Sequence, residues 1–112
     1  MSIKKKIRDI IAEHSAELAK GTMGYHSCER SIYFSLTGKD YVRVYIFGFG
    51  IELSLHTDNS VGSVFCVSGS INDLDGVWRR FRNAFKKYIA KEEEYGNDKA
   101  FVAKLKELYS LL

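Results

Sequence analysis

Residues 31–56 read SIYFSLTGKDYVRVYIFGFGIELSLH, and apolar and polar side chains alternate through most of this segment. A period of two is typical of β-strands that turn one face toward a hydrophobic core. The alternation is interrupted at residues 37–40, and at residues 47–50 the apolar positions change from even to odd numbers. A tight hairpin at each interruption predicts three consecutive antiparallel strands, although a β-bulge within one longer strand would also explain the second interruption.

The predicted strands assign their side chains to two faces of a sheet. The core face would hold nine apolar side chains: Ile32, Phe34, Leu36, Val42, Val44, Ile46, Ile51, Leu53 and Leu55. The opposite face would present Tyr33, Tyr41, Arg43, Tyr45, Glu52, Ser54 and His56. Exposed tyrosines can stack on nucleic-acid bases or anchor a protein interface, but tyrosine is also common in strands that a helix covers. We therefore regard four of these residues as a possible second contact surface: Tyr33, Tyr41, Arg43 and Tyr45.

Residues 63–68 predict a fourth strand, which follows a turn at residues 57–62. The middle of this strand is apolar on both faces, at Val64, Phe65, Cys66 and Val67. Such a run is typical of a strand that is covered from both sides, as central strands are. Within it, Cys66 is interpreted as a small packed hydrophobe.

Helical periodicity predicts three helices around these strands, over about residues 3–19, 71–95 and 98–111. The apolar stripe of the first helix includes His14, which we expect to be hydrogen-bonded in or near the core. Short connections between the strands favour an antiparallel meander. The predicted fold class is therefore α+β, in the order α-β-β-β-β-α-α. Its four-stranded antiparallel sheet, over about residues 30–69, would pack against the N-terminal helix and the long helix that follows the sheet.

The chain has 112 residues, of which 46% are apolar, and this composition predicts a single domain over residues 1–112 and excludes wholesale disorder. No apolar run approaches the roughly 18 residues of a membrane span, and residues 1–6 lack the apolar stretch of a signal peptide. Two cysteines, Cys28 and Cys66, are too few for a disulfide scaffold and suit a reducing compartment. We therefore expect a cytoplasmic protein with no membrane partner.

The formal net charge of +3 conceals an uneven distribution along the chain. Residues 76–91 contain six basic residues and no acidic one, which leaves eleven basic and fourteen acidic residues, a net charge of −3, in the rest of the chain. These six residues would lie on the side of the long helix opposite its aromatic and apolar arc: Arg79, Arg80, Arg82, Lys86, Lys87 and Lys91.

A uniformly basic helix face attracts phosphate backbones or the acidic surface of a protein. The simpler interpretation is a solvated face, since lysine and arginine are good helix formers. A merely solvated helix would be expected to alternate its charges, whereas Arg82/Lys86 and Lys87/Lys91 are like-charge pairs four residues apart. Each such pair costs a few tenths of a kcal/mol, a penalty that a binding role would explain.

Reactive side chains gather at residues 25–30, where His26 and Cys28 would share one side of a strand. A Cys–His pair can generate a nucleophilic thiolate if a third group orients the histidine. A zinc site formed by His26, Cys28, His56 and Cys66 is the alternative, but the spacing contains no close ligand pair such as CxxC. We assign no catalytic residue, no metal and no cofactor.

The sequence therefore predicts a small non-enzymatic interaction protein, of the inhibitor, immunity or adaptor type. It would dock on an acidic macromolecular surface through the basic face of the long helix, with an acidic protein as the first choice of partner. Nucleic-acid binding through the same face is the alternative, and a small thiol-dependent hydrolase at His26 and Cys28 is the third hypothesis. A homodimer would fit an uncovered tyrosine face.

Overall fold

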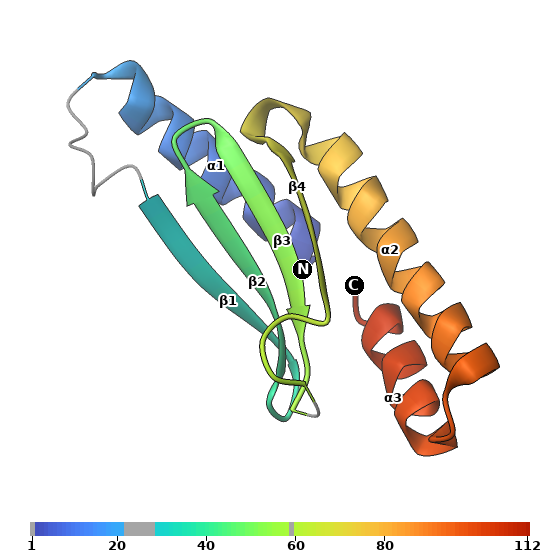
Figure 1. Ribbon diagram of the computed structural model, residues 1–112. Coiled ribbons are helices and arrows are strands. Elements are labelled where there is room, and N and C mark those ends of the chain that lie inside the picture. The colour runs from blue at the N-terminus through green and yellow to red at the C-terminus, as the bar shows by residue number, and fades with distance from the viewer. Residues whose placement is uncertain (1, 22–28, 59) are drawn as a thin grey trace.

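The computed structural model describes residues 2–21, 29–58 and 60–112 (Figure 1). Its elements, in chain order, are α1 (Ile3–Ala19), β1 (Glu29–Thr37), β2 (Asp40–Phe47), β3 (Gly50–His56), β4 (Phe65–Ser70), the short 3₁₀ turn η2 (Ile71–Asp73), α2 (Leu74–Tyr95) and α3 (Lys99–Ser110). This order confirms the predicted α+β fold, in which one antiparallel sheet packs against helices. In the described part of the chain, no helix is both long enough and apolar enough to cross a membrane.

The sheet is a meander in the order β1-β2-β3-β4, and every neighbouring pair of strands is antiparallel. Between β2 and β3 the chain turns through Gly48 and Phe49, and Gly48 has a φ of 58°. A glycine with positive φ at the first position of a two-residue turn is typical of β-hairpins. The hairpin interpretation is therefore confirmed, and the alternative of a bulge in one longer strand is wrong.

The core lies on one face of the sheet. The predicted core residues of β2 and β3 are buried, and their register places Val44 opposite Leu53 and Ile46 opposite Ile51. Side chains from α1, α2 and α3 belong to the same hydrophobic cluster, among them Ile7, Phe81 and Leu105. Three predicted core residues of β1 are only half-buried, because this strand lies at the edge of the sheet: Ile32, Phe34 and Leu36.

The predicted central position of the fourth strand is wrong, because β4 lies at the other edge of the sheet. Phe65 faces the core, where its ring centroid lies 5.3 Å from that of Phe81, but Cys66 is exposed rather than packed. The chain leaves β4 directly for η2 and α2, so α2 packs beside this edge. Gly69 permits the close approach, because a Cβ atom there would lie 2.6 Å from Cγ2 of Val77.

His14 joins α1 to the sheet and is fully buried, which confirms its predicted place in the core. Its Nε2 atom donates to the carbonyl oxygen of Gly48 at 2.8 Å, and its Nδ1 atom accepts from Nε of Arg30 at 3.2 Å. Arg30 also forms an ion pair of 2.6 Å with Glu17. These contacts fix the C-terminal half of α1 against β1 and the β2–β3 turn.

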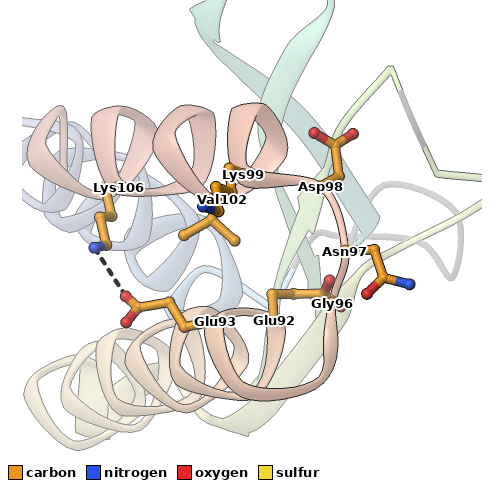
Figure 2. Close-up of a pocket in the computed structure, with 8 residues that line it drawn as sticks. All are labelled: Glu92, Glu93, Gly96, Asn97, Asp98, Lys99, Val102 and Lys106. Carbon is orange, nitrogen blue, oxygen red and sulfur yellow. Dashed lines mark ion pairs between the residues drawn. The ribbon is translucent and has the colours of Figure 1, made fainter.

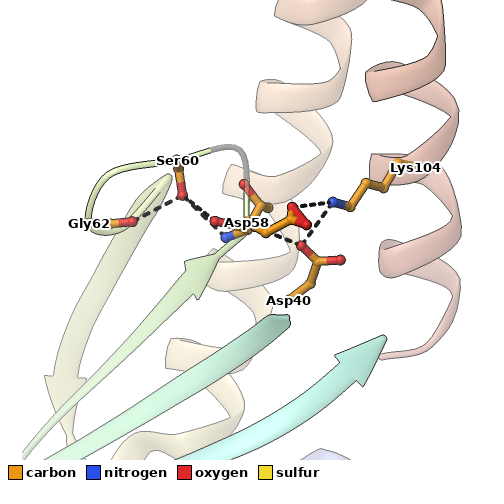
Figure 3. Close-up of polar contacts among 6 residues, drawn as sticks. Asp40, Asp58, Ser60, Gly62 and Lys104 are labelled. Carbon is orange, nitrogen blue, oxygen red and sulfur yellow. Dashed lines mark hydrogen bonds and ion pairs between the residues drawn. The ribbon is translucent and has the colours of Figure 1, made fainter. Parts of the chain in front are cut away.

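A charged cluster joins α3 to the opposite end of the sheet (Figure 3). Nζ of Lys104 lies 3.1 Å from Oδ1 of Asp40 and 3.1 Å from Oδ1 of Asp58. Asp40 is only 3% exposed, and the same oxygen accepts from the backbone N–H of Asp58 at 3.0 Å. Sequence reasoning missed this cluster, because its members lie at the start of a strand, in a loop and in a helix far apart in the chain.

Candidate interaction surface

Helix α2 presents the basic face on a rigid support. Asp73 caps its start, where Oδ1 accepts from the backbone N–H of Gly76 at 3.2 Å. On the inner side Val77, Phe81 and Phe85 are fully buried in the core. This burial fixes the rotation of the helix about its axis. The six predicted basic residues are consequently all exposed: Arg79, Arg80, Arg82, Lys86, Lys87 and Lys91.

The six basic residues form two rows along α2. At about 100° per residue, Arg80, Lys87 and Lys91 follow one row, which we call the β4 flank. Nη2 of Arg80 donates to the carbonyl oxygen of Ser68 in β4 at 2.8 Å. The other three residues form the second row, which we call the α3 flank: Arg79, Arg82 and Lys86. Its Arg82 donates from Nε to the hydroxyl oxygen of Tyr109 in α3 at 3.2 Å.

None of these six cations forms an ion pair with any residue that the structure describes. Basic residues elsewhere do: Lys4 and Arg8 pair with Asp75, and Lys106 pairs with Glu93. An exposed helix that serves only solvation normally gains from acidic neighbours at i+4. Asp75 is such a neighbour of Arg79, and their charges interact, but the other five basic residues have no acidic residue four positions away. The charge of the basic face of α2 is therefore largely uncompensated by the described part of the chain.

Acidic residues bound the basic face at both ends of α2. Asp73 and Asp75 precede it, and three glutamates follow it at residues 92–94. Near the second end, a hollow of about 400 Å³ lies beneath the turn between α2 and α3, lined partly by Glu92, Glu93 and Asp98 (Figure 2). At 1.5 Å per residue, the basic stretch from residue 79 to residue 91 is about 18 Å long. The positive surface is thus compact.

A second hollow, of about 320 Å³, lies along the α3 flank, and we call it the basic niche. It is formed where the first turn of α1 and the last turn of α3 meet α2, close to both ends of the chain (Figure 1). Its lining residues are Lys4, Asp75, Trp78, Arg79, Arg82, Asn83, Lys86 and Tyr109. Four of these residues are basic and one is acidic.

Tyr109 forms one wall of the basic niche. The guanidinium carbon of Arg82 lies 5.2 Å from the centroid of its ring, and Nζ of Lys86 lies 5.8 Å from it. Burial alone would raise the pKa of the Tyr109 hydroxyl, but hydrogen bonds from Arg82 and Lys86 and their positive charges outweigh it. The pKa of Tyr109 consequently lies below its ordinary value, because these two cations favour the deprotonated hydroxyl.

Asp75 is the acidic exception in the niche. Nζ of Lys4 lies 2.7 Å from its Oδ1, and this hydrogen bond and the charge of Lys4 hold the pKa of Asp75 below its ordinary value. In the sequence alone, Asp75 is accounted for as a residue at the start of the long helix, and Trp78 and Tyr109 as members of the apolar stripes of their helices. No local pattern could have joined them to Lys4, because only the packing of three helices brings these residues together.

The predicted second contact surface lies on the open face of the sheet. Tyr33 is 59% exposed, and its ring meets that of Tyr41 edge-on at a centroid distance of 5.4 Å. The guanidinium carbon of Arg43 lies 5.1 Å from the ring centroid of Tyr45. The buried residues of α3 belong to the core cluster rather than to this face. In the described residues, α3 therefore does not cover the tyrosines, as one interpretation of the sequence had allowed.

His56, on the same face, makes contacts that the sequence did not indicate. Its ring stacks on Tyr41 at a centroid distance of 4.6 Å, and Nε2 lies 3.0 Å from the hydroxyl oxygen of Ser54. Burial and the charge of Arg43 lower the pKa of His56, against an opposing hydrogen bond to the backbone of Gly62. Ser54 is only 3% exposed, so a substrate could not reach its oxygen without a local rearrangement. We interpret the pair as a structural contact.

The hydrolase and zinc hypotheses depend on His26 and Cys28, which lie outside the described residues. The hydrolase hypothesis therefore stays a prediction. Of the other two zinc candidates, both His56 and Cys66 belong to strands of the sheet. Within residues 2–21, 29–58 and 60–112, no group of three or more histidine, cysteine, aspartate or glutamate side chains is placed to hold a metal ion.

Comparisons of the chain with protein-family models, with curated proteins and with solved structures found no match.

Proposed function

We propose that this protein is a non-enzymatic interaction protein, of the inhibitor, immunity or adaptor type, which docks on the acidic surface of a partner protein through the basic face of α2. The observation that carries the proposal is the set of six exposed cations that form no ion pair with any described residue. Like charges at Arg82/Lys86 and Lys87/Lys91 repel each other in the free protein. An acidic partner would relieve this repulsion and supply the missing counter-charges.

The shape of the positive surface favours a protein over a nucleic acid. The basic stretch is about 18 Å long, and acidic residues stand at both of its ends. A long polyanion that follows the axis of α2 would meet Asp73 and Asp75 at one end and three glutamates at the other. A compact acidic patch on a folded protein could instead cover both flanks of α2 and avoid these carboxylates.

The proposal is tested by a comparison of charge-reversed variants as bait in affinity purification. We expect wild-type protein to recover a specific partner that the double variant R82E/K86E does not recover. The matched control is K5E/K6E, which makes the same change in charge at exposed positions of α1. Purified partner and titration calorimetry would then give the affinities. If R82E/K86E and K5E/K6E recover the same partners with the same affinities as wild type, the proposal is wrong.

Nucleic-acid binding remains the second candidate, and the open sheet face is the observation that favours it. The exposed ring of Tyr33 and the stacked pair of Tyr41 and His56 resemble the aromatic platforms on which single-stranded bases stack. Fluorescence anisotropy with labelled single-stranded and duplex oligonucleotides at about 50 mM salt distinguishes the two candidates. Our first proposal predicts no binding under these conditions, and tight binding that falls steeply with salt would favour the second.

A further inference from the structure

We infer that the basic niche binds a phosphate-monoester group on a side chain of the partner protein, so that docking depends on phosphorylation of the partner. This inference rests on the proposed function and assigns the niche a ligand of defined chemistry. The niche lies on the α3 flank of α2, between the start of α1 and the end of α3. The β4 flank would then meet ordinary acidic side chains around the phosphorylated one.

The charge of the niche suits a dianion better than a single carboxylate. The single negative charge of the niche, that of Asp75, lies 2.7 Å from Lys4 and is shared with Arg8 at 3.5 Å. Arg79, Arg82 and Lys86 remain, and none of the three forms an ion pair with a described residue. A carboxylate carries one negative charge, whereas a phosphorylated side chain carries about −1.5 to −2 near neutral pH. Three cations around one hollow therefore match the phosphate group more closely.

The hydrogen-bond donors of the niche also exceed what a carboxylate needs. Arg82 donates from Nε to Tyr109, and its terminal Nη groups can donate to a ligand. Arg79 can present two parallel N–H donors from one edge of its guanidinium group. The Tyr109 oxygen accepts from Arg82, so its own O–H can donate to a ligand. Asn83 adds an amide N–H₂ group. A phosphate monoester offers three terminal oxygens to these donors, and clusters of arginine are the usual means of recognising phosphorylated side chains.

The aromatic walls hold these donors in place. The ring of Tyr109 meets Phe85 in the core edge-on at a centroid distance of 5.4 Å, and the cations of Arg82 and Lys86 lie over the same ring. Trp78 lines the niche but is only 6% exposed, because most of its ring packs in the core. The niche is thus largely formed before a ligand arrives, which reduces the entropy cost of binding.

The test uses the full chain and follows Trp78, the only tryptophan in the sequence, as a probe within the niche. We would titrate ¹⁵N-labelled protein at constant ionic strength with three peptides: Glu-Glu-Ser-Glu-Glu, the same peptide with phosphoserine at the centre, and the same peptide with glutamate there. The ¹H–¹⁵N signal of the Trp78 indole reports binding. We expect saturable shifts with the phosphopeptide and an affinity at least tenfold weaker for the other two peptides. Equal affinities for the three peptides would overturn the inference.

Matched variants locate the binding. R82Q/K86Q on the α3 flank is expected to weaken phosphopeptide binding at least tenfold, whereas K5Q/K6Q at exposed positions of α1 outside the niche, with the same loss of charge, should weaken it less than threefold. Equal losses in the two double variants would show only non-specific attraction and overturn the assignment to the niche. Thermal unfolding of each variant verifies that the fold is intact. Free O-phosphoserine that binds as tightly as the phosphopeptide would overturn the assignment to a protein ligand.

The outcomes separate this inference from the proposed function. In one outcome, R82E/K86E fails to recover a partner that the wild-type protein recovers equally well before and after the partner is treated with phosphatase. This outcome supports docking and refutes phosphate recognition. In the other outcome, the phosphopeptide binds in the niche, but no partner protein is lost with R82E/K86E. This outcome refutes the proposed docking and supports only a phosphate-binding site.

Discussion

His14 connects α1 to the β2–β3 turn through both nitrogens of its ring. Since a carbonyl oxygen only accepts and a guanidinium only donates, the contacts to Gly48 and Arg30 define a neutral imidazole with its proton on Nε2. We predict that H14A lowers the free energy of unfolding by about 2–4 kcal/mol, because it opens a cavity and leaves buried polar groups unpaired. Urea denaturation measures the change, and the exposed neighbour E13A should stay within about 0.5 kcal/mol of wild type. A loss below about 1 kcal/mol for H14A would contradict this role.

His56 is expected to titrate below the ordinary histidine range, because burial and the charge of Arg43 lower its pKa. A histidine whose pKa is lower in the folded state contributes stability at neutral pH, and this contribution is lost as the pH falls through the folded pKa. NMR titration of the imidazole protons should show the lowered pKa, and R43Q should move it back toward the ordinary value. A pKa that is unchanged in R43Q would show that Arg43 has no part in it.

The burial of a single residue was predictable from sequence where its neighbours along the chain determine which side of the helix or strand is covered. His14 lies on an apolar stripe, and that stripe alone predicted its place in the core. Cys66 was interpreted wrongly, because apolar neighbours on both sides suggested two covered faces when only the face of Phe65 is covered. Trp78 and Tyr109 fitted helical stripes, yet the same side chains also line the basic niche, since large aromatic rings can reach both the core and its rim.

At the level of elements, Lys104 joins α3 to the start of β2 and to the β3–β4 connection (Figure 3). We predict that K104M lowers the free energy of unfolding by about 2 kcal/mol, because it leaves the buried carboxylate of Asp40 without its counter-ion. The effect should be smaller than for a fully buried pair, since Lys104 and Asp58 are partly exposed. The control is K106M, which breaks the exposed pair with Glu93 and should cost less than about 1 kcal/mol. Hydrogen exchange should show faster exchange in α3 for K104M alone, and equal exchange in both variants would contradict this role.

The same cluster predicts a loss of stability at high pH. Burial opposes the charge of Lys104, but hydrogen bonds to Asp40 and Asp58 and their charges raise its pKa above the ordinary value of 10.5. A lysine with a raised pKa in the folded state stabilises the fold at all pH values below its unfolded pKa, and this contribution disappears as the pH rises through the folded pKa. Denaturation midpoints of wild type should therefore approach those of K104M as the pH rises above the ordinary lysine range, while convergence already below that range would contradict the assignment.

The order of elements was predictable because the apolar side chains of each strand and helix recur with the period of that element, and turn residues mark where most elements end. Gly48 marks the β2–β3 hairpin, and the structure uses its positive φ there. The position of β4 was not predictable from its own residues. An apolar run shows how much of a strand is covered but not which neighbour covers it, and here α2 packs beside the edge that a fifth strand would otherwise occupy.

The whole molecule is elongated, with extents of 51 × 24 × 23 Å, and the first turn of α1 and the last turn of α3 both lie beside α2 (Figure 1). The six basic residues of α2 could be identified in the sequence because they share one helix. The basic niche could not, because Lys4 and Tyr109 come from opposite ends of the chain and reach α2 only through tertiary packing. The sequence therefore predicts the positive charge of the candidate site and the helix that carries it. The hollow beside that helix can be recognised only in the folded structure.

The separation of the +6 stretch at residues 76–91 from the net charge of −3 in the rest of the chain predicts how the protein approaches its partner. Long-range attraction accelerates encounter while the opposite charges of the two proteins lie within about one screening length of each other, about 10 Å at 0.1 M salt and 3 Å at 1 M. We expect the association rate with the acidic partner to fall at least tenfold between 0.05 and 0.5 M salt, while the dissociation rate changes much less. Stopped-flow fluorescence of Trp78 measures both rates. K5E/K6E should retain most of this salt dependence and R82E/K86E should lose it, since only the second pair belongs to the contact surface. An association rate of the wild-type protein that does not vary with salt would mean that the charges of α2 do not guide the encounter.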